Sequence, residues 1–243
     1  MAFNKSYYIT ILLLIFFSSC KEEPKTTPKS EQPVSEVKDS VLINEKTEIE
    51  EQEEEEEEEP FKLTEENAID FFYNYNKTLK DDKVKITTSL GSFTVQLYDN
   101  VPYHKANFIY LTKKGYFNNT QFHRVVKNFI IQGGNSDDKA TADKRGAIGR
   151  YLLPPDAKKG YKHHRGTISM PSSEVDNPHM LASPYEFFIV VTKPGSYHLD
   201  GEYTPFGKVI EGMDVVDKIN VQRVGKGDWP FQNIYITKAE VVK

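Results

Sequence analysis

The feature that most constrains the fold is a succession of short, β-prone apolar runs that begins at residue 83 and continues to the C-terminus. Residues 83–88 and 92–97 both alternate apolar with other side chains, and Leu90-Gly91-Ser92 separates them. Such alternation with a turn between predicts a β-hairpin. Further strands are expected at Phe122–Val126, Phe129–Gln132, Thr167–Met170, Phe187–Val191, Pro205–Val209 and Gln232–Val242.

Only two helices are expected inside this β-rich part. Pro102 is suited to the first turn of a helix that ends near Gly115. Residues 213–219 carry the pattern of a second helix. Many short strands with two helices predict a mainly β fold, either a sandwich or a closed barrel. The pattern alone does not choose between them.

The first 20 residues are typical of an export signal. A short apolar run, Ile9–Phe17, follows Lys5. It is too short to span a bilayer but suits a signal peptide. Phe17-Ser18-Ser19-Cys20 resembles a bacterial lipobox, in which the cysteine is lipidated. An ordinary secretory signal is the alternative. We favour lipidation at Cys20, because a single cysteine forms no internal disulfide.

Residues 21–60 have the composition of a disordered tether. They contain five Lys against 16 Asp and Glu, a net charge of −11, and Glu53–Glu59 are consecutive. Such a segment buries too little apolar surface to offset the entropy of ordering. We expect a solvated spacer, with loose binding of Ca²⁺ or a basic client as the weaker alternative.

Residues 61–82 predict a helical extension before the β-rich domain, 83–243. Thr64 is a candidate cap, with Glu65 and Glu66 in the first turn. Residues 61–243 carry 25 basic and 20 acidic residues, without a recognised nucleic-acid or phosphate-binding motif. We therefore expect no nucleic-acid partner, no cofactor and no metal site. Three histidines are expected in solvent-exposed loops, with a metal role as the less favoured alternative: His163, His164 and His179.

The run Phe122–Gly134 places one arginine within an apolar strand pattern and ends in Gln132-Gly133-Gly134. A guanidinium is costly to bury, so Arg124 is expected at the rim of a pocket or beside a partner.

This run resembles the signature of the cyclophilin family of peptidyl-prolyl isomerases, and the resemblance covers residues 83–242. The family's other blocks follow in order: the opening hairpin, the helix near Ala106, Glu186-Phe187-Phe188-Ile189, Leu199-Asp200-Gly201, Phe206-Gly207-Lys208-Val209 and Gly212-Met213. The resemblance implies a closed eight-stranded antiparallel barrel capped by two helices, with an active-site groove on its outer face.

By this resemblance Arg124 is the catalytic residue. An X–Pro bond isomerises over a barrier of about 18–20 kcal/mol, because amide resonance is lost at the top. A fixed guanidinium can donate a hydrogen bond to the prolyl nitrogen of the twisted amide and stabilise its carbonyl. This chemistry requires no nucleophile, metal or cofactor.

The same resemblance implies a substrate-binding set around Arg124. Phe129, Ile130, Phe188 and Leu199 match the proline pocket, although core packing is the alternative for both phenylalanines. Gln132 matches an amide that orients the arginine, and His123 is expected to support the site from behind or simply to pack. The remaining positions depart from the family's common residues: Pro171, Ser172, Glu186, His198 and Tyr203.

Two of these departures carry specific expectations. Glu186 stands where the family often has Gln, and its carboxylate is expected either to pair with Arg124 or to compete with the substrate carbonyl. His198 stands where eukaryotic members often have a Trp tied to cyclosporin binding, so weak cyclosporin binding is expected. The loop from Pro171 to Tyr185 is longer than in compact eukaryotic members and is expected to affect substrate choice.

The sequence thus predicts a monomeric, lipid-anchored prolyl isomerase of the bacterial cell envelope, facing either the periplasm or the exterior. Its expected partners are proline-containing unfolded or exported polypeptides, and the membrane through Cys20. The alternative is a catalytically weak scaffold that binds proline peptides in the same groove.

Overall fold

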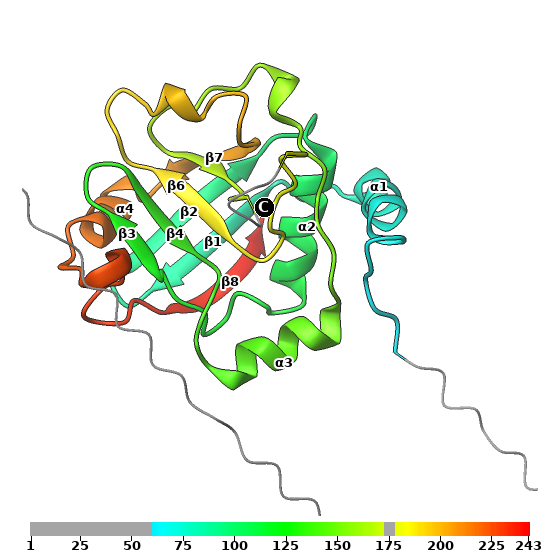
Figure 1. Cartoon of the computed structure of the whole chain (residues 1–243), viewed down its shortest axis with the longest axis horizontal. Helices are drawn as coiled ribbons and strands as arrows, with labels where there is room; N and C mark the ends of the chain where they lie inside the picture. Colours follow the sequence, from blue (N-terminus) through cyan, green and yellow to red (C-terminus); the bar gives the residue numbers. More distant parts are fainter. Residues whose placement is uncertain (1–59, 173–177) are drawn as a thin grey trace, which may run out of the picture. The chain divides into compact units, whose positions relative to one another are not determined.

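The short strands expected from residue 83 onward assemble into one antiparallel sheet of eight strands (Figure 1). The computed structural model describes residues 60–172 and 178–243, so Cys20 and the acidic run lie outside the described residues. The sheet order is β3-β4-β6-β5-β7-β2-β1-β8. The strands are β1 Lys83–Thr88, β2 Gly91–Leu97, β3 Arg124–Val126, β4 Ile130–Gly133, β5 Thr167–Ser169, β6 Phe187–Val190, β7 Pro205–Glu211 and β8 Ile236–Val242.

The sheet curls, and loop segments link its two edge strands. Main-chain bonds run from Phe122 N to Ile234 O (2.9 Å) and from Ile236 N to Thr120 O (2.8 Å), and Gln121 bridges to Tyr235. These bonds lie just before β3 and at the start of β8. The mainly β, eight-stranded antiparallel fold is confirmed, but β3 and β8 do not pair as strands. The expected closure is made by loop backbone.

The inner face of the sheet forms the main core with two helices. α2 (Pro102–Lys113) and α4 (Met213–Asn220) lie at opposite ends of the curled sheet (Figure 1). The rings of Phe108 and Phe187 meet edge to face at 5.5 Å, and Phe206 lies 5.3 Å from Phe108. Both expected internal helices are therefore confirmed.

Two further helices lie outside this core. The extension forms α1 (Ala68–Thr78), but Asn67 is the residue before its first turn, so the expected cap at Thr64 is wrong. Residues 65–67 form a turn before the helix, and Leu63 is held by Ile148 O (2.8 Å) and Arg150 N (2.9 Å). α3 (Lys139–Ile148) was not predicted.

The extension docks where a glycine is required. Gly149 has φ +131°, and a β-carbon there would lie 1.9 Å from the Leu63 carbonyl oxygen. Leu63 itself is fully buried. Any side chain at residue 149 would therefore displace the extension from the domain.

The outer face of β4 and β6 carries a second, smaller apolar cluster. Side chains alternate along a strand, so Ile131, Phe187 and Ile189 join the main core while Ile130, Phe188 and Val190 point outward. All three outward side chains are nonetheless at most 5% exposed. They are packed against partly buried side chains from the end of β3, the turn that follows it and the η2 region: Val126, Phe129, Leu199 and Tyr203.

Three short 3-10 turns complete the described elements: η1 (Ala157–Lys159), η2 (Tyr197–Leu199) and η3 (Lys226–Asp228). Within the described residues, none of the helices has the length and apolarity needed to cross a membrane.

Candidate active site

The outer apolar cluster gathers the residues that the sequence predicted for a proline pocket. Ile130 and Phe188 are its buried members, and Phe129 and Leu199 pack against them. The ring of Tyr203 meets that of Phe188 edge to face at 5.5 Å. His198 stacks on Phe129 at 5.4 Å. The structure thus brings these predicted pocket residues together from β4, β6 and the η2 segment.

Strand register places the polar residues in line with this pocket. Arg124 in β3 is paired with Gln132 in β4, and Gln132 is paired with Phe188 in β6. The three side chains therefore form a row across three adjacent strands. The side chain of Arg124 is 41% exposed, so its charge stays in contact with solvent at the end of this row.

Glu186 binds a different set of groups from the one expected. Its carboxylate accepts hydrogen bonds from Gln132 Nε2 (2.8 Å) and Asn135 Nδ2 (2.9 Å), and lies 3.4 Å from His123 Nε2. The ionic partner of Arg124 is instead Asp228, whose Oδ2 lies 3.6 Å from Nε. The expected pairing of Glu186 with Arg124 is therefore corrected: Glu186 contacts His123, which precedes the arginine, and Gln132, which is paired with it across the sheet.

Electrostatics keep the Glu186 carboxyl ionised. Burial alone raises its pKa, but the hydrogen bonds and charge from His123, the bond from Gln132 and the charge of Arg145 outweigh burial. The net pKa lies below its ordinary value. An ionised carboxylate accepts from Gln132 Nε2, so the amide oxygen of Gln132 is directed to its other side.

Behind the pocket, a buried hydrogen-bonded chain joins Asp200, His163 and Ser169. His163 Nδ1 lies 2.9 Å from Asp200 Oδ1, and Nε2 lies 3.0 Å from Ser169 Oγ. The imidazole stacks on the Phe188 ring at 6.1 Å and 12°. His163 is fully buried, so its expected solvent exposure is wrong. Burial lowers its pKa despite the neighbouring Asp200 carboxylate.

These three hydrogen-bonded residues have the order of a hydrolytic Ser-His-Asp triad. Unlike such a triad, they are not accessible to a substrate. Ser169 and His163 both have 0% exposure, so a substrate carbonyl cannot reach Ser169 Oγ. The chain instead fixes the back of Phe188 and ties the η2 segment to β5. Sequence reasoning missed it because its three residues lie in separate motifs.

The remaining predicted residues lie at the edges of the site. Pro171 O accepts from Ser183 N (2.9 Å), and Ser172 forms a bridge with Ala182, at the base of the loop whose residues 173–177 lie outside the described set. His164 is exposed and bonds to Tyr197 (2.9 Å). In residues 60–172 and 178–243, no three metal-ligating side chains gather.

Comparison with known proteins places residues 83–241 in one family. The family described as "Cyclophilin type peptidyl-prolyl cis-trans isomerase/CLD" matches residues 83–241. The chain is 36% identical over 160 residues to peptidyl-prolyl cis-trans isomerase CYP18-1 of Arabidopsis thaliana, covering 65% of this chain and 94% of that relative. It is also 36% identical over 171 residues to peptidyl-prolyl cis-trans isomerase-like 2 of Rhizopus delemar, covering 70% of this chain but only 30% of that longer relative.

A solved structure supports the same match. A cyclophilin-type peptidyl-prolyl cis-trans isomerase of Cryptosporidium parvum, crystallised in the presence of the dipeptide Ala-Pro, superimposes with a TM-score of 0.56 at 29% identity. The match covers 66% of this chain and 99% of that chain.

Proposed function

Since the chain belongs to the cyclophilin-type peptidyl-prolyl cis–trans isomerase family, we propose that it isomerises X–Pro bonds of exported polypeptides, with Arg124 as the catalytic residue. The family match makes the chain a prolyl isomerase. The substrates and the role of each groove residue are the proposal.

The row Arg124–Gln132–Phe188 is the observation that carries this proposal. A proline ring seated on Ile130 and Phe188 puts its amide beside β4, within the span of one neighbouring strand from Arg124. Adjacent strands lie about 4.8 Å apart, so a guanidinium side chain from β3 reaches that amide. The relative crystallised with Ala-Pro supports a proline-containing ligand for this groove.

The chemistry asks for a donor that is fixed before the barrier is reached. As the amide twists, the prolyl nitrogen regains a lone pair that accepts a hydrogen bond. A guanidinium already aimed at that nitrogen stabilises the twisted amide more than the planar one. Gln132, with its amide nitrogen held by Glu186, keeps its oxygen available for the arginine or the substrate backbone.

The N-terminal sequence supports the choice of substrate. A signal peptide ending at Cys20 would deliver the domain to the cell envelope, and lipidation would anchor it there through the 21–60 tether. Slow X–Pro isomerisation limits the folding rate of chains that arrive unfolded after export. An isomerase held beside the membrane meets them early.

The test is a protease-free isomerisation assay on a proline peptide, using a chain that starts at Lys21 and so keeps the whole unit of residues 57–243. We expect wild-type acceleration and a loss of about 100-fold or more in Arg124→Ala, the size seen when one such donor is removed. Arg150→Ala, an exposed arginine outside the groove, is the matched control. A wild type that binds proline peptides without accelerating them would favour the scaffold function instead.

A further inference from the structure

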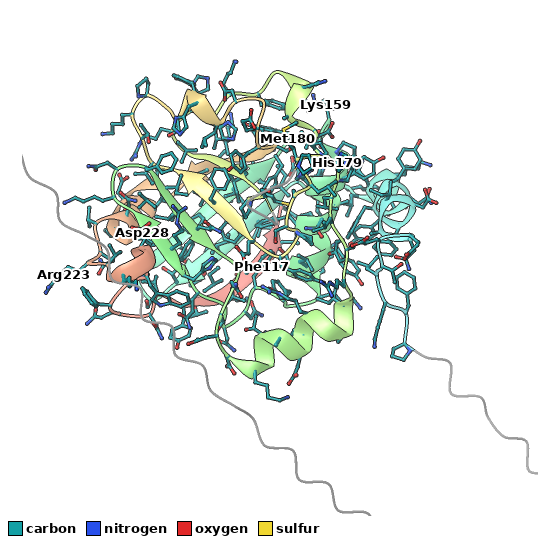
Figure 2. All side chains as sticks on the ribbon, viewed as in Figure 1. Phe117, Lys159, His179, Met180, Arg223 and Asp228 are labelled. Carbon is teal, nitrogen blue, oxygen red and sulfur yellow. The ribbon has the colours of Figure 1, made fainter. Side chains whose placement is uncertain are left out.

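The loop after α4 contacts the start of β3 through two successive residues. Asp228 Oδ2 lies 3.6 Å from Arg124 Nε, and the ring of Trp229 lies 5.9 Å from that of His123. Two neighbours in this loop therefore meet two neighbours at the start of β3. Figure 2 labels Asp228 beside this sheet edge, with Arg223 farther out.

The loop is closed and holds an unfavourable backbone conformation. Gly225 N donates to Trp229 O (2.8 Å), and Phe231 N donates to Arg223 O (3.0 Å). Inside this closure, Gly227 has φ +74° and Asp228 has φ +61°. A non-glycine residue keeps a left-handed conformation only where its surroundings determine it, which is common beside active sites.

The two carboxylates near the groove have separate partners. Glu186, 18% exposed, is occupied by Gln132, Asn135 and His123. Asp228, 43% exposed, meets Arg124. A half-exposed ion pair contributes little to folding stability. Its effect is expected on orientation instead: a carboxylate 3.6 Å from Nε, at ion-pair rather than hydrogen-bond distance, attracts that edge of the guanidinium without competing for the two terminal Nη groups.

We propose that Asp228 is a positioning residue for the isomerase reaction, which directs the Arg124 guanidinium into the groove through its contact at Nε. Trp229, packed on His123, holds the same end of β3. This inference rests on the catalytic role proposed for Arg124. It adds a residue far from the apolar strand motif in sequence.

The decisive variants are Asp228→Gly and Asp228→Asn. Glycine accepts the left-handed conformation and removes the carboxylate, so any loss is not due to backbone strain. Asparagine tolerates the same conformation and keeps an acceptor without the charge. Asp214→Asn is the matched control, because Asp214 pairs with Lys218 (2.9 Å) on the surface of α4.

We expect Asp228→Gly to lower kcat about five- to tenfold with little change in KM, Asp228→Asn to lose less, and Asp214→Asn to match wild type. All three should unfold thermally at nearly the wild-type temperature. As a readout independent of turnover, the ¹⁵Nε–¹Hε resonance of Arg124 should shift and broaden in Asp228→Gly but not in Asp214→Asn.

Two results would overturn the proposal: an Asp228→Gly enzyme with wild-type kcat, or an unchanged Arg124 Nε–H resonance in that variant. Either result, with Arg124→Ala inactive, removes the role of Asp228 alone. An active Arg124→Ala enzyme would instead remove the catalytic assignment on which it rests.

Discussion

The two sides of the groove are built by opposite means. The pocket side, around Phe188, is buried: Ile130, Phe188 and Val190 are at most 5% exposed, and His163 behind them is fully buried. The arginine side is solvent-exposed, and the side chains of Arg124 and Asp228 are each more than 40% exposed. One side is held by packing and the other by exposed charge.

This difference follows from what each side has to do. A proline ring is apolar and keeps its shape during isomerisation, so a rigid buried surface serves throughout. The arginine carries a charge that is expensive to bury, and it must act at the twisted amide. Substitutions on the pocket side should therefore lower stability and binding together. Substitutions on the arginine side should lower turnover with little effect on stability.

The largest effect is expected from Phe188→Ala. It removes a buried ring that contacts both His163 and Tyr203, and such substitutions lower the free energy of unfolding by about 3–5 kcal/mol. Urea unfolding and the KM for a proline peptide should both worsen. Phe188→Leu, which keeps most of the volume, should cost less. A Phe188→Ala protein of unchanged stability with a lower kcat would break the comparison.

The next effect is on the pH dependence of stability, tested with His163→Gln. Because burial lowers the pKa of folded His163, the unfolded chain binds a proton that the folded chain resists. The stabilising contribution of neutral His163 is therefore full above its unfolded pKa of about 6.5, and is lost as the pH falls below it.

Loss of the His163 bonds should cost about 1–3 kcal/mol at pH 7.5 and less at pH 5.5, as measured by urea unfolding at both values. His104 shifts in the same direction, its pKa lowered by burial to about 3, but it is present in both proteins and cancels. Asp200, whose pKa is also lowered, titrates below this window. The control is His164→Gln, at an exposed position, which should leave the free energy of unfolding unchanged. If His163→Gln lowers that free energy equally at both pH values, His163 does not titrate on unfolding.

One part of the pocket side could be predicted from the sequence because it is local. Phe129, Ile130 and Gln132 lie within one strand and its turn, where alternation decides which face each side chain takes. The match to a family motif then supplied Arg124 and Phe188. Alternation could not predict how the sheet closes. Its two edges are linked by backbone hydrogen bonds between residues 119–122 and 234–236, which do not depend on the side-chain pattern.

The supports of the site were missed because they are long-range or lack a pattern. Asp228 reaches Arg124 through a turn whose residues show no periodicity, and His163 is buried only because Asp200 and Ser169 surround it. α3 was missed because only Thr141 and Ile148 of its residues are buried, so it shows no apolar stripe. His163 is thus a tertiary contact that overrides a local signal, whereas Asp228 and α3 carry no local signal to read.

The smallest effect is expected from Glu186→Gln, which tests where the two sides meet. Glutamine keeps one acceptor but presents an NH₂ to a neighbouring donor, so one bond from Gln132 or Asn135 is lost, at about 1 kcal/mol. Because the pKa of Glu186 lies below its ordinary value, the carboxylate stays ionised at neutral pH. Its contribution to stability is full above the unfolded pKa of about 4.3 and is lost as the pH falls through the folded value.

Activity measured at pH 6, 7 and 8 should therefore follow the same profile in wild type and in Glu186→Gln, with kcat changed only a few-fold. A wild-type profile that titrates in this range and becomes flat in Glu186→Gln would mean that Glu186 reaches Arg124 during turnover, and that the arginine is held by the buried side of the groove as well as by Asp228.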